Sequence, residues 1–313
     1  MSPFPLAGEV AALGTALFWS LSTMAWSLAG RRVGSVAVTT IRSALGAVAL
    51  AALFRTMYGS WWPAALGSKA LLLFALSGAL GAGVGDLMLF RSYLIIGPRL
   101  GMLILALSPI FAALIAWVTP LHETLGLQAI AGIATTVAGV AWVVSARGSE
   151  DAWIPSAGGF MLGLLLAIGG TLCVAGGFVL SRMGFAVAAE VREAAFGATY
   201  VRVAAATLCC LAALPLFGKV RGTLRAFRDR RAMAIIAAGT LVGPILGIWL
   251  SMVAIHWSPT GVVTALMSTA PIMMIPITWL AYGDRPTARS LGGTLLAVAG
   301  AFLLLLRGSG AGR

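Results

Sequence analysis

The chain has 313 residues, of which 60% are apolar and only 10% are charged, and its mean hydropathy is +1.00. Soluble domains average about 25% charged residues, so this composition excludes a water-facing surface around the whole molecule and indicates the lipid bilayer as the main partner. The net charge of +12 would favour nucleic acid as the partner of a soluble protein, but the basic residues mostly flank apolar segments, so no nucleic-acid partner is expected.

A helix needs about 20 apolar residues to cross a hydrocarbon core of about 30 Å. Runs of this kind, separated by charged residues, glycine and proline, occur ten times in the chain. The connections between them are too short to fold as separate soluble domains. We therefore predict an all-α polytopic membrane protein with ten transmembrane helices. The predicted spans are Gly8–Leu28, Val33–Phe54, Leu71–Leu89, Gly101–Val118, Leu125–Ser145, Gly158–Leu180, Ala194–Phe217, Met233–Ile255, Gly261–Tyr282 and Ala288–Leu306.

Several landmarks of the first half recur in the second half in the same order, which predicts a duplicated five-helix unit with repeats at residues 1–146 and 147–313. Because five is odd, the second unit enters the membrane from the opposite side, and the two repeats are inverted. Two such halves can open a midplane site first to one side and then to the other, as a carrier does. The matched landmarks are Arg42 and Arg202, Gly81 and Gly239, Gly85 and Gly243, Pro109 and Pro271, Glu123 and Asp284, and Gly139 and Gly300.

Five motifs of the first half are repeated more loosely in the second: Ala16–Ser20, Arg42 with Ala44, Gly85–Leu87, Ala106–Pro109 leading to Glu123, and Ala138–Val140. In this order they resemble the EamA family of the drug/metabolite transporter superfamily over essentially the full chain. The resemblance implies ten helices and the movement of small metabolites such as amino acids, often outward. We therefore expect a secondary transporter and not an enzyme, exporting small metabolites or amphipathic compounds by alternating access. The expected location is the plasma membrane, as a multi-pass protein of the bacterial inner membrane.

Arg42 lies roughly 13 Å into the second predicted helix, where an unpaired charge is costly. Asp86 lies at a similar depth in the antiparallel third helix, so we predict an ion pair between them. Either the pair only neutralises two charges, or Asp86 is a proton or cation site that exchanges partners during transport. In relatives of the small multidrug resistance family a glutamate in the first helix exchanges protons. Trp19 and Ser20 occupy that region here, so that mechanism is not supported.

Arg202 is the counterpart of Arg42 in the second half, but the position matching Asp86 is Pro244, and no other carboxylate is expected at its depth. Two interpretations stay open. Arg202 is satisfied by carbonyls and hydroxyls such as that of Thr199, or it binds an anionic group of a small-molecule substrate.

Trp19, Ser108, Trp249 and Thr269 come from the first, fourth, eighth and ninth predicted helices and resemble the cavity-lining residues of the family, which makes them candidate substrate-binding residues. The tryptophans have an alternative interpretation, because lipid-facing tryptophans are common in membrane proteins. The GxxxG pairs of the third and eighth helices favour close helix packing over ligand contact.

Four prolines, Pro109, Pro244, Pro271 and Pro276, interrupt apolar helices and are expected to kink them. Such kinks can supply hinges and polar groups to a cavity, or neighbouring helices can absorb them. Glu123 and Asp284 precede the last helix of each half, where a negative charge suits a helix N-terminus, and are interpreted as structural.

No metal or cofactor is expected, because the cysteines lack CxxC spacing and His122 and His256 lie on separate segments. The basic loop at residues 218–232 favours a cytoplasmic position, which places both termini outside, whereas the family resemblance implies termini inside. The orientation therefore stays open. A membrane-embedded enzyme and a non-transporting scaffold are the alternative functions. Proton or ion coupling is a further possibility, and the sequence predicts no oligomeric state.

Overall fold

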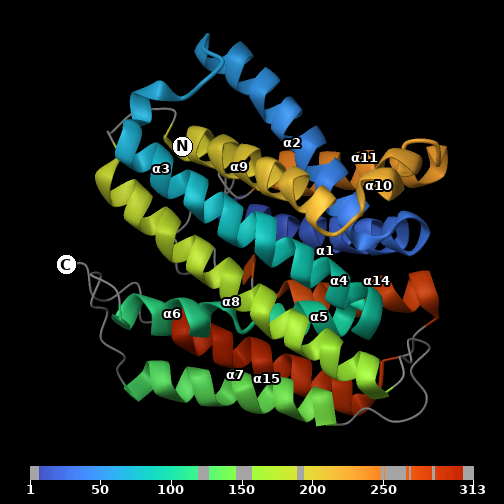
Figure 1. Cartoon of the computed structure of the whole chain (residues 1–313). Coiled ribbons are helices and arrows are strands. Elements are labelled where there is room, and N and C mark those ends of the chain that lie inside the picture. Colours follow the sequence, from blue (N-terminus) through green and yellow to red (C-terminus); the bar gives the residue numbers. More distant parts are fainter. Residues whose placement is uncertain are drawn as a thin grey trace.

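The computed structural model describes residues 7–118, 127–145, 157–188, 194–247, 250, 266–267, 269–283 and 286–305, and the elements in these ranges are all helices (Figure 1). This confirms the predicted all-α class. The elements are α1 (Ala7–Val33), α2 (Ser35–Tyr58), η1 (Ala64–Leu66), α3 (Ser68–Ser77), η2 (Gly78–Gly85), α4 (Asp86–Ile96), α5 (Pro98–Leu105), α6 (Ser108–Val118), α7 (Leu127–Ser145), α8 (Ala157–Val187), α9 (Ala194–Leu216), α10 (Val220–Ala226), α11 (Arg230–Thr240), η3 (Leu241–Gly247), α14 (Ala270–Tyr282) and α15 (Ala288–Leu305).

Five of the described helices are long and apolar enough to cross a membrane, and three further apolar helices are shorter. The ten predicted spans are thus recovered only in part. Large apolar side chains such as Val48, Leu72, Leu208 and Leu280 lie exposed on these helices, as expected of a surface that faces lipid. The long helices cover Ser35–Tyr58, Ser68–Ile96, Gly159–Val187, Ala194–Leu216 and Arg230–Gly247, and the shorter ones Pro98–Ala112, Ala134–Val143 and Ala270–Ala281.

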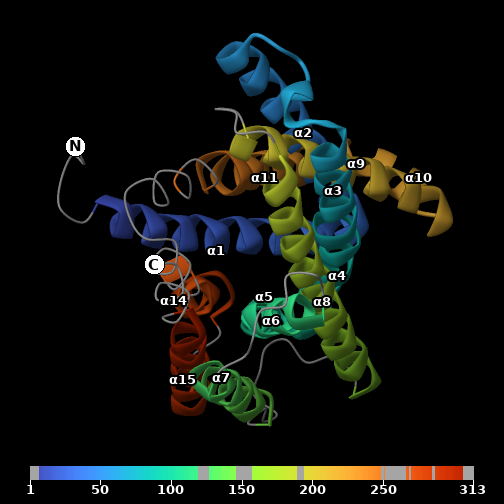
Figure 2. The ribbon, with the colours of Figure 1, turned by 90° about the vertical axis from the view of Figure 1, so that its left-hand side faces the viewer.

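Helices of the first half pair with helices of the second half in a reciprocal pattern. α1 packs along α11 and η3, while α8 packs along α3, η2 and α4. In the same way α1 contacts α14 and α8 contacts α6, whereas α2 lies against α9. α7 and α15 lie side by side in Figures 1 and 2. This exchange of partners between halves is the pattern that a two-repeat architecture of the EamA type produces.

The glycine-rich segment η2 lets its neighbours approach at backbone distance. A Cβ atom at Gly78 would lie 2.1 Å from the carbonyl oxygen of Arg202 in α9, which leaves no room for any side chain. On another side of the segment, a Cβ atom at Gly81 would meet the Cα of Gly177 in α8 at 3.4 Å, an ordinary contact distance. Glycine is therefore required at position 78 in order to bring α9 against the third helix.

A second glycine seam, made by Gly239, Gly243 and Gly247, joins α1 to α11 and η3. These three glycines recur every four residues and face two tryptophans and a serine on one side of α1. Both GxxxG pairs singled out in the sequence thus lie at close helix contacts. In this seam Gly239 faces Trp26, Gly243 faces Ser22, and Gly247 faces Trp19.

Pro109 and Pro271 each lie in the first turn of a helix, whereas Pro276 lies inside α14. α5 ends at Leu105, and α6 restarts at Ser108 with Pro109 as its second residue. Pro271 is likewise the second residue of α14. The first turn of a helix tolerates proline, because its missing N–H group would have no intrahelical partner there. Pro244 lies within the π-helical segment η3, whose wider turn accommodates a break in the helical hydrogen-bond ladder.

The two glycines of η2 give a matched test of this packing. Gly78→Ala should overpack the contact with α9 and lower the free energy of unfolding by roughly 1–3 kcal/mol or more, because backbone atoms cannot move aside cheaply. Gly81→Ala should change stability far less. The measurement is thermal unfolding of both purified variants in the same detergent, and equal melting temperatures would contradict the packing described.

Candidate functional site

The ion pair expected between Arg42 and Asp86 is present in the structure. The guanidinium Nη2 of Arg42 in α2 donates to the Oδ2 of Asp86, the first residue of α4. The Arg42 side chain is 10% exposed and the Asp86 side chain 22%, so the carboxylate is the more accessible partner. Since α4 follows directly on η2, a π-helical segment sets the direction in which Asp86 points, and π-helical turns are frequent at functional sites.

Two aromatic rings enclose the guanidinium of Arg42. Its Cζ lies 4.4 Å from the ring centroid of Trp26 in α1 and 4.5 Å from that of Phe90 in α4. Trp26 is itself held by a hydrogen bond of 3.4 Å from its Nε1 to the carbonyl oxygen of Ile236 in α11. Cation–π contact and one charged hydrogen bond therefore compensate the desolvation of Arg42, although its Nε is buried without a hydrogen-bond partner in the described part of the chain.

Sequence reasoning missed these aromatic partners. The available signal was their spacing: Phe90 lies one helical turn after Asp86, and Trp26 lies two turns after Trp19 on the same face of α1.

Arg202 in α9 lies in a different environment. Its Cζ is 5.5 Å from the ring centroid of Phe178 in α8, and its Nε is buried without a hydrogen-bond partner within the described ranges. The Thr199 hydroxyl, one of the expected partners, donates to the carbonyl oxygen of Ala195 in its own helix. The Nε of Arg202 therefore keeps an unused hydrogen-bond donor within the part of the chain that the structure describes.

The carboxylate of Asp86 interacts electrostatically with both arginines. The interaction is stronger with Arg42, which is hydrogen-bonded to it, and weaker with Arg202, which is not. The sequence analysis considered Asp86 only as a partner of Arg42, because Asp86 belongs to the other half of the chain. The close contacts of α9 at Gly78 and Gly83 in η2, the segment that precedes Asp86, bring the two halves together here. Among the described residues, this part of the molecule holds two cations and one anion.

The other candidate residues that the structure describes, Trp19, Ser108 and Thr269, lie on or beside different helices. Trp19 is partly exposed on α1 beside Gly247 of η3. Ser108 begins α6, and Thr269 precedes α14, where its hydroxyl donates to the carbonyl oxygen of Leu266 at 2.6 Å. Trp249, Glu123 and Asp284 lie outside the described residues.

Within the ranges that the structure describes, no group of three or more His, Cys, Asp or Glu side chains is placed to hold a metal ion.

The sequence model of the EamA-like transporter family matches residues 6–145 and again residues 161–306. The chain belongs to this family. No curated protein matches it. One solved structure, titled only "Crystal structure of protein", aligns with 98% of this chain and 98% of its own at a TM-score of 0.63 and 18% identity. At that identity the likeness concerns the fold alone.

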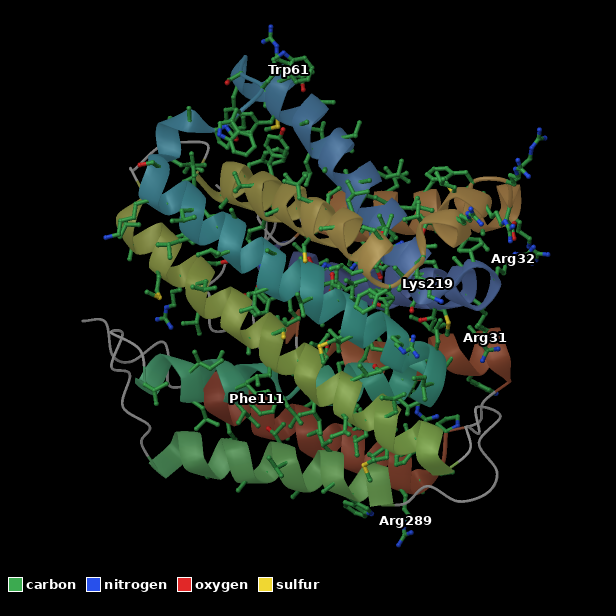
Figure 3. The ribbon with its side chains drawn as sticks, viewed as in Figure 1. Arg31, Arg32, Trp61, Phe111, Lys219 and Arg289 are labelled. Carbon is green, nitrogen blue, oxygen red and sulfur yellow. The ribbon has the colours of Figure 1, made fainter. Side chains whose placement is uncertain are left out.

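The EamA-like chain is a multi-pass membrane protein whose polar ends differ in character. Arg31 and Arg32 end α1, and Arg32 Nε bonds to the Oδ2 of Asp229 at 2.9 Å. Lys219 lies at the same end, whereas Trp61 lies beyond the far end of α2 (Figure 3). There the Cζ of Arg55 lies 5.9 Å from the ring centroid of Trp61. An aromatic cluster at this end consists of Phe54, Tyr58, Trp62, Phe196 and Tyr200. Such clusters are typical of a membrane–water interface.

The sharing of Asp86 predicts an asymmetry between its two partners in this transporter. Among the described residues, Asp86→Asn leaves Arg42 and Arg202 without a nearby carboxylate, whereas Arg42→Gln leaves Asp86 with Arg202. Removing one member of a buried pair costs roughly 3–5 kcal/mol, so Asp86→Asn should lower the melting temperature clearly more than Arg42→Gln.

Adding Arg202→Gln to Asp86→Asn removes one of the unpaired cations and should recover part of the loss. The measurement is the melting temperature of the three variants in one detergent. Additive losses in the double variant would show that Asp86 and Arg202 are independent.

Proposed function

We propose that this protein is a secondary transporter that exports small metabolites or amphipathic compounds carrying an anionic group, with Arg202 as the residue that binds this group. The observation that carries the proposal is the Nε of Arg202, which is buried without a hydrogen-bond partner among the described residues. An arginine kept at this depth without its own acceptor is suited to a ligand carboxylate or phosphate, which its planar fork binds through two parallel hydrogen bonds.

The chemistry of the centre favours an anion over a cation. Among the described residues, Asp86 is the carboxylate whose charge acts on both Arg42 and Arg202, and a bound anion would balance the remaining positive charge. Amino acids satisfy this requirement through their carboxylate, and amphipathic organic acids satisfy it while placing apolar groups against rings such as that of Phe178. Trp19, Ser108, Trp249 and Thr269 are proposed as further contacts on the neighbouring helices.

The proposed mechanism is alternating access between two inverted five-helix repeats, at residues 1–146 and 147–313, with ten spans in all. The reciprocal pairing of α1 with α11 and of α8 with α3 supports it, because equivalent contacts on the two sides can exchange open and closed arrangements. The broken helices α5 and α6, and the start of α14 at Pro271, supply the points at which the fourth and ninth helices can change direction.

Asp86 is the proposed coupling residue. Its carboxylate is the accessible member of the pair, and the charges of both arginines act on it, so it can exchange Arg42 for Arg202 or for a proton during the cycle. Proton coupling requires that a pH gradient across a proteoliposome membrane drives substrate accumulation. Accumulation that ignores this gradient would exclude protons as the coupling ion.

We propose further that the end with Arg31, Arg32 and Lys219 faces the cytoplasm, because basic residues are retained on that side. A membrane-impermeant thiol reagent should then label Gly222→Cys, in a background without native cysteines, only after the cells are opened. Labelling of intact cells would place this end outside.

The direct test is thermal stability in detergent against amino acids, organic anions, nucleosides and cationic dyes. A ligand at about a hundred times its dissociation constant stabilises the folded state by roughly 2.7 kcal/mol. We expect an anionic or zwitterionic compound to raise the melting temperature of the wild type and of Arg55→Gln, a control at an exposed arginine, but not that of folded Arg202→Gln.

Stabilisation by cationic dyes alone would contradict the anion site. If no compound stabilised the protein and reconstituted vesicles moved none of them, the scaffold interpretation would replace the transporter.

A further inference from the structure

A pocket of about 380 Å³ opens at the basic end of the molecule, away from the Arg42–Asp86 pair. It lies where α1 passes into α2, between the end of α4 and the short helix α10, and its lining includes Gly34, Ser35, Arg91, Lys219 and Thr223. Figure 3 shows Lys219 at this end, near the side of the molecule that carries Arg31 and Arg32. Apolar side chains of α1, α2 and α4, among them Leu94, form the rest of its wall.

The N-terminus of α2 contributes unpaired backbone donors to this pocket. Gly34 is the N-cap, at φ 87°, and no side chain caps the helix. The first intrahelical hydrogen bond runs from the N–H of Val38 to the carbonyl oxygen of Gly34, so the N–H groups of residues 35–37 have no partner within the helix. All three of these residues line the pocket, at the positive end of a 24-residue helix.

Thr223 of α10 gives an independent indication of a ligand. The residue is 5% exposed, and its hydroxyl oxygen is buried without a hydrogen-bond partner in the described part of the chain. Buried hydroxyls are nearly always hydrogen-bonded, because an unpaired one keeps its full desolvation cost. A ligand atom in the pocket would supply the missing partner.

The charged residues of the lining are both cations. Within the described residues neither Arg91 nor Lys219 forms an ion pair, and the carboxylate of Asp229 at the start of α11 is already bonded to Arg32 at 2.9 Å. Helix N–H groups, a hydroxyl, a guanidinium and an ammonium together form a set of donors, and no carboxylate occurs among the lining residues that the structure describes. This set matches a phosphate group, which offers several acceptor oxygens and negative charge.

We propose that this pocket binds a phosphate group, with the N-terminus of α2, Thr223, Lys219 and Arg91 as donors. The group comes from the headgroup of an anionic phospholipid or from free phosphate. The site lies where two membrane helices end and exposes apolar wall residues beside its donors, so a lipid headgroup there could keep its acyl chains along the helices. Occupancy would join α2 to α10 and so connect the two halves of the chain at this end.

The test uses the full-length protein in detergent, with binding followed by native mass spectrometry and by melting temperature. The probes are short-chain phosphatidylglycerol, the same chain length of phosphatidylcholine, and inorganic phosphate. The variants are Thr223→Val, Lys219→Gln and their combination, with Arg225→Gln as the matched control, since Arg225 is an exposed basic residue of α10 outside the lining.

We expect saturable binding of phosphatidylglycerol but not phosphatidylcholine, weakened about tenfold or more by the double variant and unchanged by Arg225→Gln. Competition by inorganic phosphate would identify a free phosphate site, and its absence would assign the site to the lipid headgroup. Equal affinities in the double variant and the Arg225→Gln control would overturn the proposal, as would the absence of binding by both phosphate probes.

A second measurement does not depend on the probe. Without ligand, Thr223→Val should be at least as stable as the wild type, because it replaces a buried hydroxyl that has no partner with a methyl group of similar shape. A clear loss of stability in the ligand-free protein would show that the hydroxyl is bonded internally, and would remove the indication of a ligand.

Discussion

Two arginines, Arg42 in α2 and Arg202 in α9, lie under the charge of the Asp86 carboxylate, which is bonded to Arg42. Arg42 is compensated by Asp86 and by the rings of Trp26 and Phe90, whereas the described residues supply Arg202 with the unbonded charge of Asp86 and the ring of Phe178. Leaving a charge under-compensated in an apolar interior is expensive. The proposed binding of an anion at Arg202 would offset this cost.

The glycine seams make this arrangement possible. Asp86 can act on Arg202 because α9 meets η2 at backbone distance beside Gly78, and Trp26 can cover Arg42 because α1 meets α11 closely at Gly239. Each seam joins one half of the chain to the other. Packing and electrostatics are therefore not separable here: a side chain added to a seam would move the charges apart as well as strain the helices.

Sequence reasoning succeeded where depth along a single helix decides the outcome. Counting turns placed Arg42 opposite Asp86, because neighbouring antiparallel helices have a simple relation of depth. It failed for Arg202, whose relation to Asp86 depends on a contact between halves that no local pattern encodes. The sequence also did not place the break between α5 and α6, which lies just before Pro109. The unpaired hydroxyl of Thr223 could not be predicted from the sequence, because nothing in the sequence of this basic loop indicates that its threonine is buried.

The most direct test of the shared-carboxylate account is an experimental structure with a stabilising anion bound, using an analogue that carries a heavy atom. The account predicts that the anion lies within hydrogen-bond distance of the Arg202 guanidinium, between the two halves, while Asp86 remains with Arg42. An anion found only at the N-terminus of α2, with Arg202 still against Phe178 and no ligand between the halves, would contradict it.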